Sequence, residues 1–250
     1  MNHDISVLLR GWEYNASEVT VRKIIGVDGS EKIQMRLDLG LLQMETLGRP
    51  DGQHPQGYES LLELHSARRR TFGEAHGDED DFELTTEECS DLKQEAMQYY
   101  YRYLSLFHLG DYAGVIRDTQ RNLYAFDLVR AHAEDDNERT SLEQFRPYVL
   151  MMNTRAKACL LLEDQEFDRA LDKIESGIER IHDFFVEVER SDLADNCREI
   201  AFLRDWSERI KNNRPLTSQD RLKQELRVAV EAEDYERAAK LRDEIKELVA

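Results

Sequence analysis

The hydrophobic and polar positions near the N-terminus alternate as they do in β-strands. In "SEVTVRKIIGVDGSEKIQMRLDL", residues 17–39, two β-prone runs flank the dipeptide Asp28-Gly29. The second run alternates apolar and polar residues, which indicates a half-buried strand, and Asp-Gly is a favoured hairpin turn. We therefore predict a β-hairpin within a small α+β segment, residues 1–72.

That segment ends in a predicted helix over about residues 58–72, and an acidic stretch follows it. From Glu74 to Ser90 there are eight acidic residues and no Lys or Arg. Such a run repels itself and is usually solvated, so residues 73–90 are predicted to form an acidic linker. Thr85, with Glu88 three residues later, is placed to start the next helix through a capping box.

Helical periodicity dominates residues 91–212. Five helices of roughly 20 residues, each roughly 30 Å long, are separated by short breaks such as Gly110-Asp111. Neighbouring helices joined by short links run antiparallel and form a bundle or a helical-repeat array. The predicted fold class is therefore mainly α: long-helix antiparallel hairpins, a small N-terminal α+β segment and a C-terminal helical hairpin.

Two turns in this helical body share an aromatic residue followed three positions later by a small or apolar residue. The pairs are Tyr112 with Val115 and Phe167 with Ala170. The second pair of helices resembles a tetratricopeptide repeat, and the first pair resembles one more weakly. The two aromatic residues lie 55 positions apart, against a period of 34 in that family. The resemblance therefore implies a divergent relative with longer helices.

Residues 218–250 predict a separate hairpin of two short helices. Leu222, Leu226, Ala229 and Val230 are predicted to share one face of the first helix, and Asp234 is placed to cap the second. A domain below roughly 40 residues seldom has enough core to be stable alone. We therefore expect this hairpin to contact a partner, or alternatively to dock on the helices of its own chain.

The same stretch, "LKQELRVAVEAEDYERAAKLRDEIKEL", resembles the UVR motif, the helical hairpin shared by the excinuclease subunits UvrB and UvrC. A leucine-bearing helix, an acidic turn, an aromatic residue, Ala-Ala and Leu-Arg-Asp carry the resemblance. In that family the hairpin is a protein–protein contact element without catalytic residues. The resemblance implies that the partner-binding positions are Leu222, Leu226, Ala229, Tyr235, Ala238, Ala239, Leu241, Arg242 and Ile245.

The charge of the chain is unevenly distributed. Residues 71–218 hold 18 basic and 33 acidic residues, which gives most of the total net charge of −18. A surface this acidic repels phosphate backbones, so the helical body is not expected to bind nucleic acid. Residues 1–70 are nearly balanced, with 9 basic and 10 acidic residues.

No motif for catalysis, for a cofactor or for a metal ion is visible. The chain has no GxxxxGK[ST] loop, no HExxH and no GxSxG. Three distant cysteines without a CxxC pair fit a reducing cytosol. His54, His65 and His76 are eleven apart, but Pro and Gly interrupt the first interval, so scattered polar histidines are favoured over a metal site. The aromatic run "QYYYRYLSLF", 98–107, is interpreted as core rather than as a base-stacking surface.

Together these features predict a non-enzymatic cytoplasmic adaptor without cofactors. Its partner is expected to be a protein, either another UVR-type hairpin, with a link to nucleotide excision repair, or a copy of itself. No stretch approaches the roughly 18 apolar residues of a membrane span, so no membrane contact is expected. The alternative is a nucleic-acid-binding protein whose N-terminal segment uses Lys23, Lys32, Arg36 and Arg68–Arg70 to contact phosphates.

Overall fold

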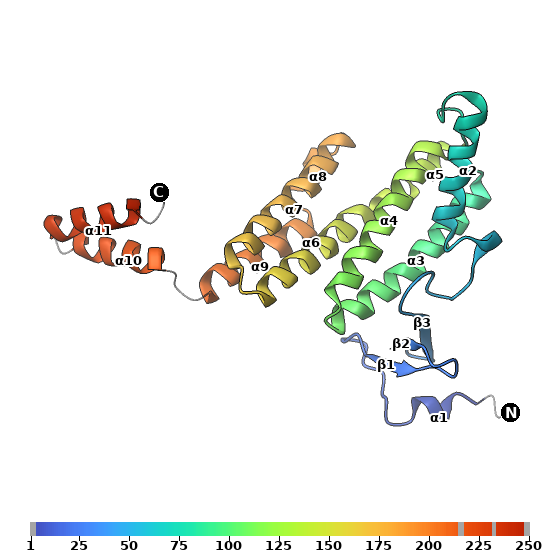
Figure 1. Ribbon diagram of the computed structural model, residues 1–250, viewed down its shortest axis with the longest axis horizontal. Helices are drawn as coiled ribbons and strands as arrows, with labels where there is room; N and C mark the ends of the chain where they lie inside the picture. Colours follow the sequence, from blue (N-terminus) through green and yellow to red (C-terminus); the bar gives the residue numbers. More distant parts are fainter. Residues whose placement is uncertain (1–3, 215–217, 232–233, 248–250) are drawn as a thin grey trace. The chain divides into compact units, whose positions relative to one another are not determined.

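The computed structural model describes residues 4–214, 218–231 and 234–247 (Figure 1). The chain forms two compact units, residues 1–205 and 206–250. It is mainly helical, with a small antiparallel sheet at the N-terminus and a helical hairpin at the C-terminus, which confirms the predicted fold class. The domain boundaries predicted at residues 72 and 90 lie within the first unit and stay predictions.

The N-terminal sheet contains the predicted hairpin and one further strand. After the short helix α1 (Ser6–Leu9), the strands β1 (Val21–Ile25), β2 (Glu31–Arg36) and β3 (Leu41–Glu45) pair antiparallel in the order β1-β2-β3. Gly29 occupies the turn with φ +80°, a conformation open to glycine. The second strand ends at Arg36 and does not run on to Leu39, which is 87% exposed. Ile33 and Met44, paired across β2 and β3, are buried.

The helix after the sheet lies slightly later than the sequence predicts. A 3-10 turn, η1 (Pro55–Gly57), precedes α2 (Leu61–His76). Ser60 caps α2 by accepting a hydrogen bond from the Glu63 N–H group (3.2 Å). The helix ends at Gly77, whose φ is +97°, as expected for a left-handed C-terminal residue.

The interpretation of residues 73–90 as a solvated linker is wrong around Phe82 and Leu84. Phe82 is 5% exposed and Leu84 is fully buried. The Leu84 N–H group donates to the His132 carbonyl (2.7 Å), and the Leu84 carbonyl accepts from the Glu134 N–H group (3.0 Å). Two apolar residues within an acidic run are enough to hold the segment against the fold, because their burial is independent of the charges beside them.

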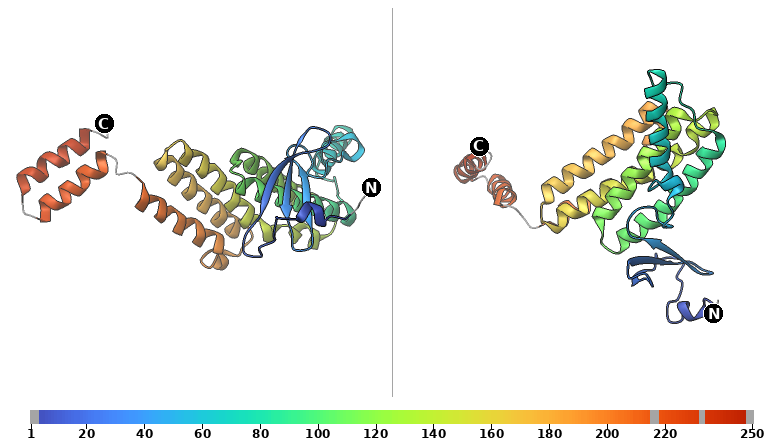
Figure 2. Two further views of the ribbon diagram at one scale, coloured as in Figure 1. Left: turned by 90° about the horizontal axis from the view of Figure 1, so that it is seen from below. Right: turned by 45° about the vertical axis from the view of Figure 1, so that its right-hand side comes forward.

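The helical body consists of long neighbours that pack in chain order. Figures 1 and 2 show the four longest helices side by side, and their packing pairs are α3 with α4, α4 with α6, and α6 with α7. The predicted capping box at Thr85 and Glu88 is confirmed. The elements are α3 (Thr86–His108), α4 (Tyr112–His132), α5 (Asp136–Ser141), η2 (Glu143–Phe145), α6 (Arg146–Glu163), α7 (Phe167–Glu187), α8 (Ser191–Ala194) and α9 (Arg198–Asn213).

Close approach of α6 and α7 depends on a glycine. A Cβ atom at Gly177 would lie 2.3 Å from the side chain of Thr154. The two helices therefore meet at a distance that no larger residue permits there. None of the helices in the described part of the chain is long and apolar enough to cross a membrane.

Candidate functional site

The C-terminal hairpin consists of α10 (Ser218–Glu231) and α11 (Tyr235–Glu247), which pack against each other (Figure 1). Asp234 ends the turn between them. Its N–H group donates to the Ala229 carbonyl (2.8 Å), and its Oδ1 atom accepts from the Arg237 N–H group (3.1 Å). The predicted cap of the second helix is therefore confirmed. An ion pair between Arg237 and Glu225 (3.1 Å) joins the two helices.

The described side chains of this hairpin include a small apolar core. Ala229 (4% exposed) and Leu241 (6% exposed) are its buried residues among the described side chains, and Leu222 and Leu226 pack against them half-buried. Burying a large aliphatic side chain contributes only about 1.5–3 kcal/mol. A unit of fewer than roughly 40 residues seldom has enough core to be stable alone.

Among the described side chains of the hairpin, two valines and a tyrosine are exposed to solvent. Val228 is 54% exposed, Val230 is 50% exposed and Tyr235 is 68% exposed. Each lies in a sequence rich in charged residues that would otherwise keep the surface polar. Val228 and Val230 are two positions apart on α10 and therefore do not share one face of that helix. Exposed apolar and aromatic side chains are typical of protein contact surfaces.

The nine predicted partner-binding positions therefore divide by environment. Leu222, Leu226, Ala229 and Leu241 hold the hairpin together, whereas Tyr235, Ala239 and Arg242 are exposed. The side chains of Ala238 and Ile245 lie outside the described residues. Sequence reasoning did not single out Val228, and it placed Val230 on the face of the first helix that packs against the second. Apolar residues at adjacent positions do not by themselves show which of them faces the other helix of the hairpin. Which of these residues contact a partner stays a prediction.

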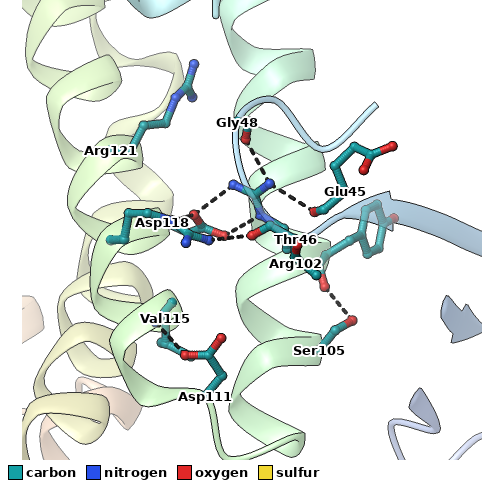
Figure 3. A network of polar contacts seen from close by, with 12 residues as sticks. Glu45, Thr46, Gly48, Arg102, Ser105, Asp111, Val115, Asp118 and Arg121 are labelled. Carbon is teal, nitrogen blue, oxygen red and sulfur yellow. Dashed lines mark hydrogen bonds and ion pairs between the residues drawn. The ribbon is translucent and has the colours of Figure 1, made fainter. Parts of the chain in front are cut away.

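A buried ionic network links the helical body to the N-terminal sheet (Figure 3). Arg102 on α3 is 1% exposed and forms a two-pronged ion pair with Asp118 on α4, with N–O distances of 2.7 and 2.9 Å. Its third nitrogen donates to the carbonyl of Glu45 (3.1 Å), the last residue of β3, and to that of Gly48 (2.8 Å) in the turn that follows. Arg117 adds a second contact to Asp118 (2.9 Å).

Glu95, seven residues before Arg102 on α3, joins α2 to the same network. Its carboxylate is fully buried and accepts from the Leu61 N–H group (2.8 Å) at the start of α2. It also contacts Arg49 (3.4 Å) and Arg121. The aromatic ring of Tyr99 lies beneath the guanidinium groups of Arg102 (4.8 Å) and Arg121 (4.2 Å). A carboxylate at a helix N-terminus stabilises that helix.

This network positions elements relative to one another within the unit formed by residues 1–205. Asp118 contacts Arg102 and Arg117, and Glu95 contacts Arg49, Arg121 and the N–H group of Leu61. Burial raises the pKa of the Tyr99 hydroxyl to about 12, so that hydroxyl stays protonated. Sequence reasoning missed Arg102 because it stands inside the aromatic run 98–107. The available signal was the pair Glu95 and Arg102, seven residues apart on one otherwise apolar helical face.

The cations assigned to the alternative, a nucleic-acid reader, are largely engaged within the chain. Lys23 pairs with Glu31 (3.0 Å), and Lys32 contacts Asp28 (2.9 Å) and Glu45. Arg36 donates to the carbonyls of Trp12 (2.9 Å) and Gly40 (2.8 Å). Arg68 and Arg69 pair with Glu88 and Glu79. These contacts compensate the positive charge that phosphate binding requires.

The three histidines that share an eleven-residue spacing have different surroundings. His65 is 3% exposed and lies 3.0 Å from Arg68, whereas His54 and His76 are exposed. No group of three metal-ligating side chains is present among the residues that the structure describes.

Comparison with known proteins identifies one family. The model of the UvrB/uvrC motif matches residues 217–250, which include both helices of the C-terminal hairpin. This confirms the resemblance found in the sequence and points to a role in protein interaction or in a process related to DNA repair. No curated protein matches the chain. No solved structure matches it either.

Proposed function

We propose that this protein is a non-enzymatic cytoplasmic adaptor that binds a protein partner through its C-terminal hairpin. The observation that carries the proposal is the UvrB/uvrC motif match over a hairpin that exposes Val228, Val230 and Tyr235. A second helical hairpin laid against one of these exposed side chains would bury apolar surface that otherwise faces solvent.

The partner that fits this surface is another UVR-type hairpin, in a different protein or in a second copy of the chain. A link to nucleotide excision repair follows if that protein belongs to the repair machinery. The helical body, residues 91–212, acts in this proposal as a second partner surface, in the manner of tetratricopeptide-like helical pairs. The body carries most of the net negative charge, which favours a protein over a nucleic acid as its partner.

The experiment is affinity purification from the native cell with three forms of the protein. They are the full-length chain, a chain that ends at Asn213, and the full-length Tyr235→Ala variant. The proposal expects one set of partners to be lost with the truncation and weakened by Tyr235→Ala, because this ring is 68% exposed and contributes little to the hairpin itself. Identical partner sets for all three forms would remove the role proposed for the hairpin.

A matched control separates contact from folding. Leu241→Asp places a charge in the hairpin core, since Leu241 is 6% exposed, and should abolish the same partners by unfolding the hairpin. Tyr235→Ala should act without unfolding, which circular dichroism of the variant would verify.

A further inference from the structure

A cavity of 530 Å³ lies where α3, α4, η2 and α6 meet, within the unit formed by residues 1–205. Six aromatic side chains contribute to its wall: Tyr100, Tyr101, Tyr103, Phe126, Phe145 and Tyr148. The centroid of the Tyr100 ring lies 5.5 Å from that of Tyr103 and 6.1 Å from that of Tyr148, with planes inclined by 88° and 55°. The rings thus meet as walls at an angle rather than as a flat stack.

A second cavity, of 340 Å³, continues along α3 toward β3 and the turn after it. Met97 and Tyr101 line both cavities, so they form the wall between them. Met97 is 43% exposed despite its apolar side chain. Together the two cavities form a two-part hollow, which we name the α3 groove, along one face of that helix.

The α3 groove is poor in charge although the chain is rich in it. Its charged lining residues are Lys93 and Glu199 in the larger cavity and Asp51 in the smaller one. Asp51 is already paired with Arg49 (3.2 Å). The surrounding stretch 71–218 carries a large excess of acidic residues. An aromatic lining with few charged groups is typical of a site that binds an apolar side chain.

Polar groups that could hold a peptide backbone also face the groove region. The structure shows no hydrogen bond from the hydroxyls of Tyr100, Tyr101, Tyr103 or Tyr148 to another described residue. Burial raises the pKa of Tyr100, Tyr103 and Tyr148, so these hydroxyls remain protonated donors. The side-chain amide of Gln98 donates to Asp51 (3.1 Å), while its Oε1 atom accepts no hydrogen bond.

We propose that the α3 groove binds a peptide segment of a partner protein that carries two apolar side chains, at least one of them aromatic, between basic residues. The larger cavity takes the aromatic side chain and the smaller one takes an aliphatic side chain across Met97. The basic residues are attracted by the net negative charge of residues 71–218 as a whole, which speeds association. This inference rests on the proposed adaptor function, because it identifies the surface by which the helical body holds its own partner.

The test titrates three synthetic peptides into the full-length protein and measures binding by calorimetry. Acetyl-Lys-Trp-Gly-Leu-Lys-amide has both apolar anchors and basic ends. Acetyl-Glu-Trp-Gly-Leu-Glu-amide has acidic ends, and acetyl-Lys-Gly-Gly-Gly-Lys-amide has no anchors. The proposal expects saturable binding of the first peptide, binding of the second weaker by about fivefold or more, and no saturable binding of the third.

A pair of matched variants places the binding site. Met97→Asn changes the wall between the cavities and should weaken the first peptide by about fivefold or more through lost apolar contact. Val186→Asn, on α7 and also exposed (51%), lines neither cavity and should leave binding unchanged. Gln144→Trp, at an exposed position of the larger cavity's lining, should weaken binding by obstruction.

Several results would overturn the proposal. These are an absence of saturable binding to the first peptide, equal effects of Met97→Asn and Val186→Asn, and equal affinity for the first and third peptides. Displacement of the first peptide by a ten-nucleotide oligothymidylate would instead make the groove a nucleic-acid site. Tyr235→Ala should not change the titration, so a hairpin without partners and a groove without peptide are distinguishable failures.

Discussion

At the scale of single residues, the fold depends on charges that have been taken out of water. Removing one partner of a buried ion pair leaves the other uncompensated, which is far more destabilising than losing a surface pair. Arg102 illustrates the difference, because it is 1% exposed and satisfies Asp118 together with two backbone carbonyls. Arg117 contacts the same carboxylate, but its side chain is 41% exposed.

Arg102→Met should lower the free energy of unfolding by about 3–5 kcal/mol, because Asp118 loses its buried counter-charge. Arg117→Met should cost no more than about 1 kcal/mol, since water replaces the lost contact. Urea denaturation followed by circular dichroism measures both. Equal effects of the two substitutions would contradict the assignment of Arg102 as the buried partner.

His65 makes the stability of the unit formed by residues 1–205 depend on pH. Burial lowers the pKa of His65; Glu88 raises that pKa, Arg68 lowers it and Asp91 raises it. A group whose folded pKa is lowered contributes stability that is fully present above its unfolded pKa, about 6.5, and is lost as pH falls toward the folded pKa. The neutral ring also keeps the nitrogen that accepts from Arg68.

The urea concentration at the midpoint of unfolding should therefore decrease as the pH is lowered from 7.5 to 5. His65→Gln should make this decrease smaller. The exposed His54 serves as the control, and His54→Gln should leave the pH profile unchanged. A profile that is the same in the wild-type protein and in His65→Gln would refute the role given to His65.

At the scale of secondary-structure elements, glycine, which has no side chain, sets the spacing between two of the helices. α6 and α7 approach at Gly177, where a methyl group would meet Thr154 at 2.3 Å. In α2, by contrast, a methyl group at Gly73 would meet mainly the flexible side chain of Glu79 (2.7 Å). The same substitution should therefore have opposite consequences in the two helices.

Gly177→Ala should destabilise the protein by about 1–3 kcal/mol, because the packed helices must move apart. Gly73→Ala should be neutral or should stabilise by up to about 1 kcal/mol, since alanine favours a helix more than glycine does and Glu79 can move. Thermal unfolding compares the two. A destabilisation of similar size at both positions would show that helix propensity and close approach are not the controlling factors.

Elements set by local chemistry are the ones that the sequence predicts well. The capping box at Thr85 and Glu88 and the turn at Asp28-Gly29 each depend on neighbouring residues. Strand β3 was not predicted, because "LLQME" does not alternate clearly and its order comes from pairing with β2. The contacts of Arg102 were missed for the same reason, since its partners lie 16 to 57 residues away.

The candidate sites differ in the same way, because one depends on residues that are close in the sequence and the other on residues that are far apart in it. The hairpin is recognisable because its pattern lies within one continuous stretch, and the UvrB/uvrC motif model matches that stretch. The α3 groove combines residues from α3, α4, η2 and α6, which only the tertiary fold brings together. The interpretation of the aromatic run 98–107 as core is correct for Tyr99 and Tyr103, which are buried. Tyr100 and Tyr101, in the same run, line a cavity.

At the scale of the whole molecule, the proposed pairing of one UVR-type hairpin with another implies that two copies of this chain could pair through their hairpins. If a second copy occupies the hairpin surface, the chain should dimerise in a concentration-dependent manner. Val228→Asp should shift the equilibrium toward the monomer, because Val228 is 54% exposed and lies on the proposed contact surface. Val186→Asp, at a valine of similar exposure (51%) on α7, should not.

Sedimentation velocity over a range of concentrations measures this equilibrium. Dimerisation that both substitutions leave intact would assign the interface to another part of the chain. A protein that stays monomeric at every concentration would remove self-association and leave a hairpin of a different protein as the proposed partner.

The contacts of Arg102 and Arg117 with the turn after β3 use the carbonyls of Glu45, Thr46 and Gly48. The side chain of Leu47, in the same turn, is 70% exposed and takes no part in them. Because the acceptors are main-chain oxygens, substitution of the turn residues leaves them in place. An inserted or deleted residue would instead displace the acceptors. Among relatives, the amino-acid sequence of this turn should therefore vary while its length stays constant.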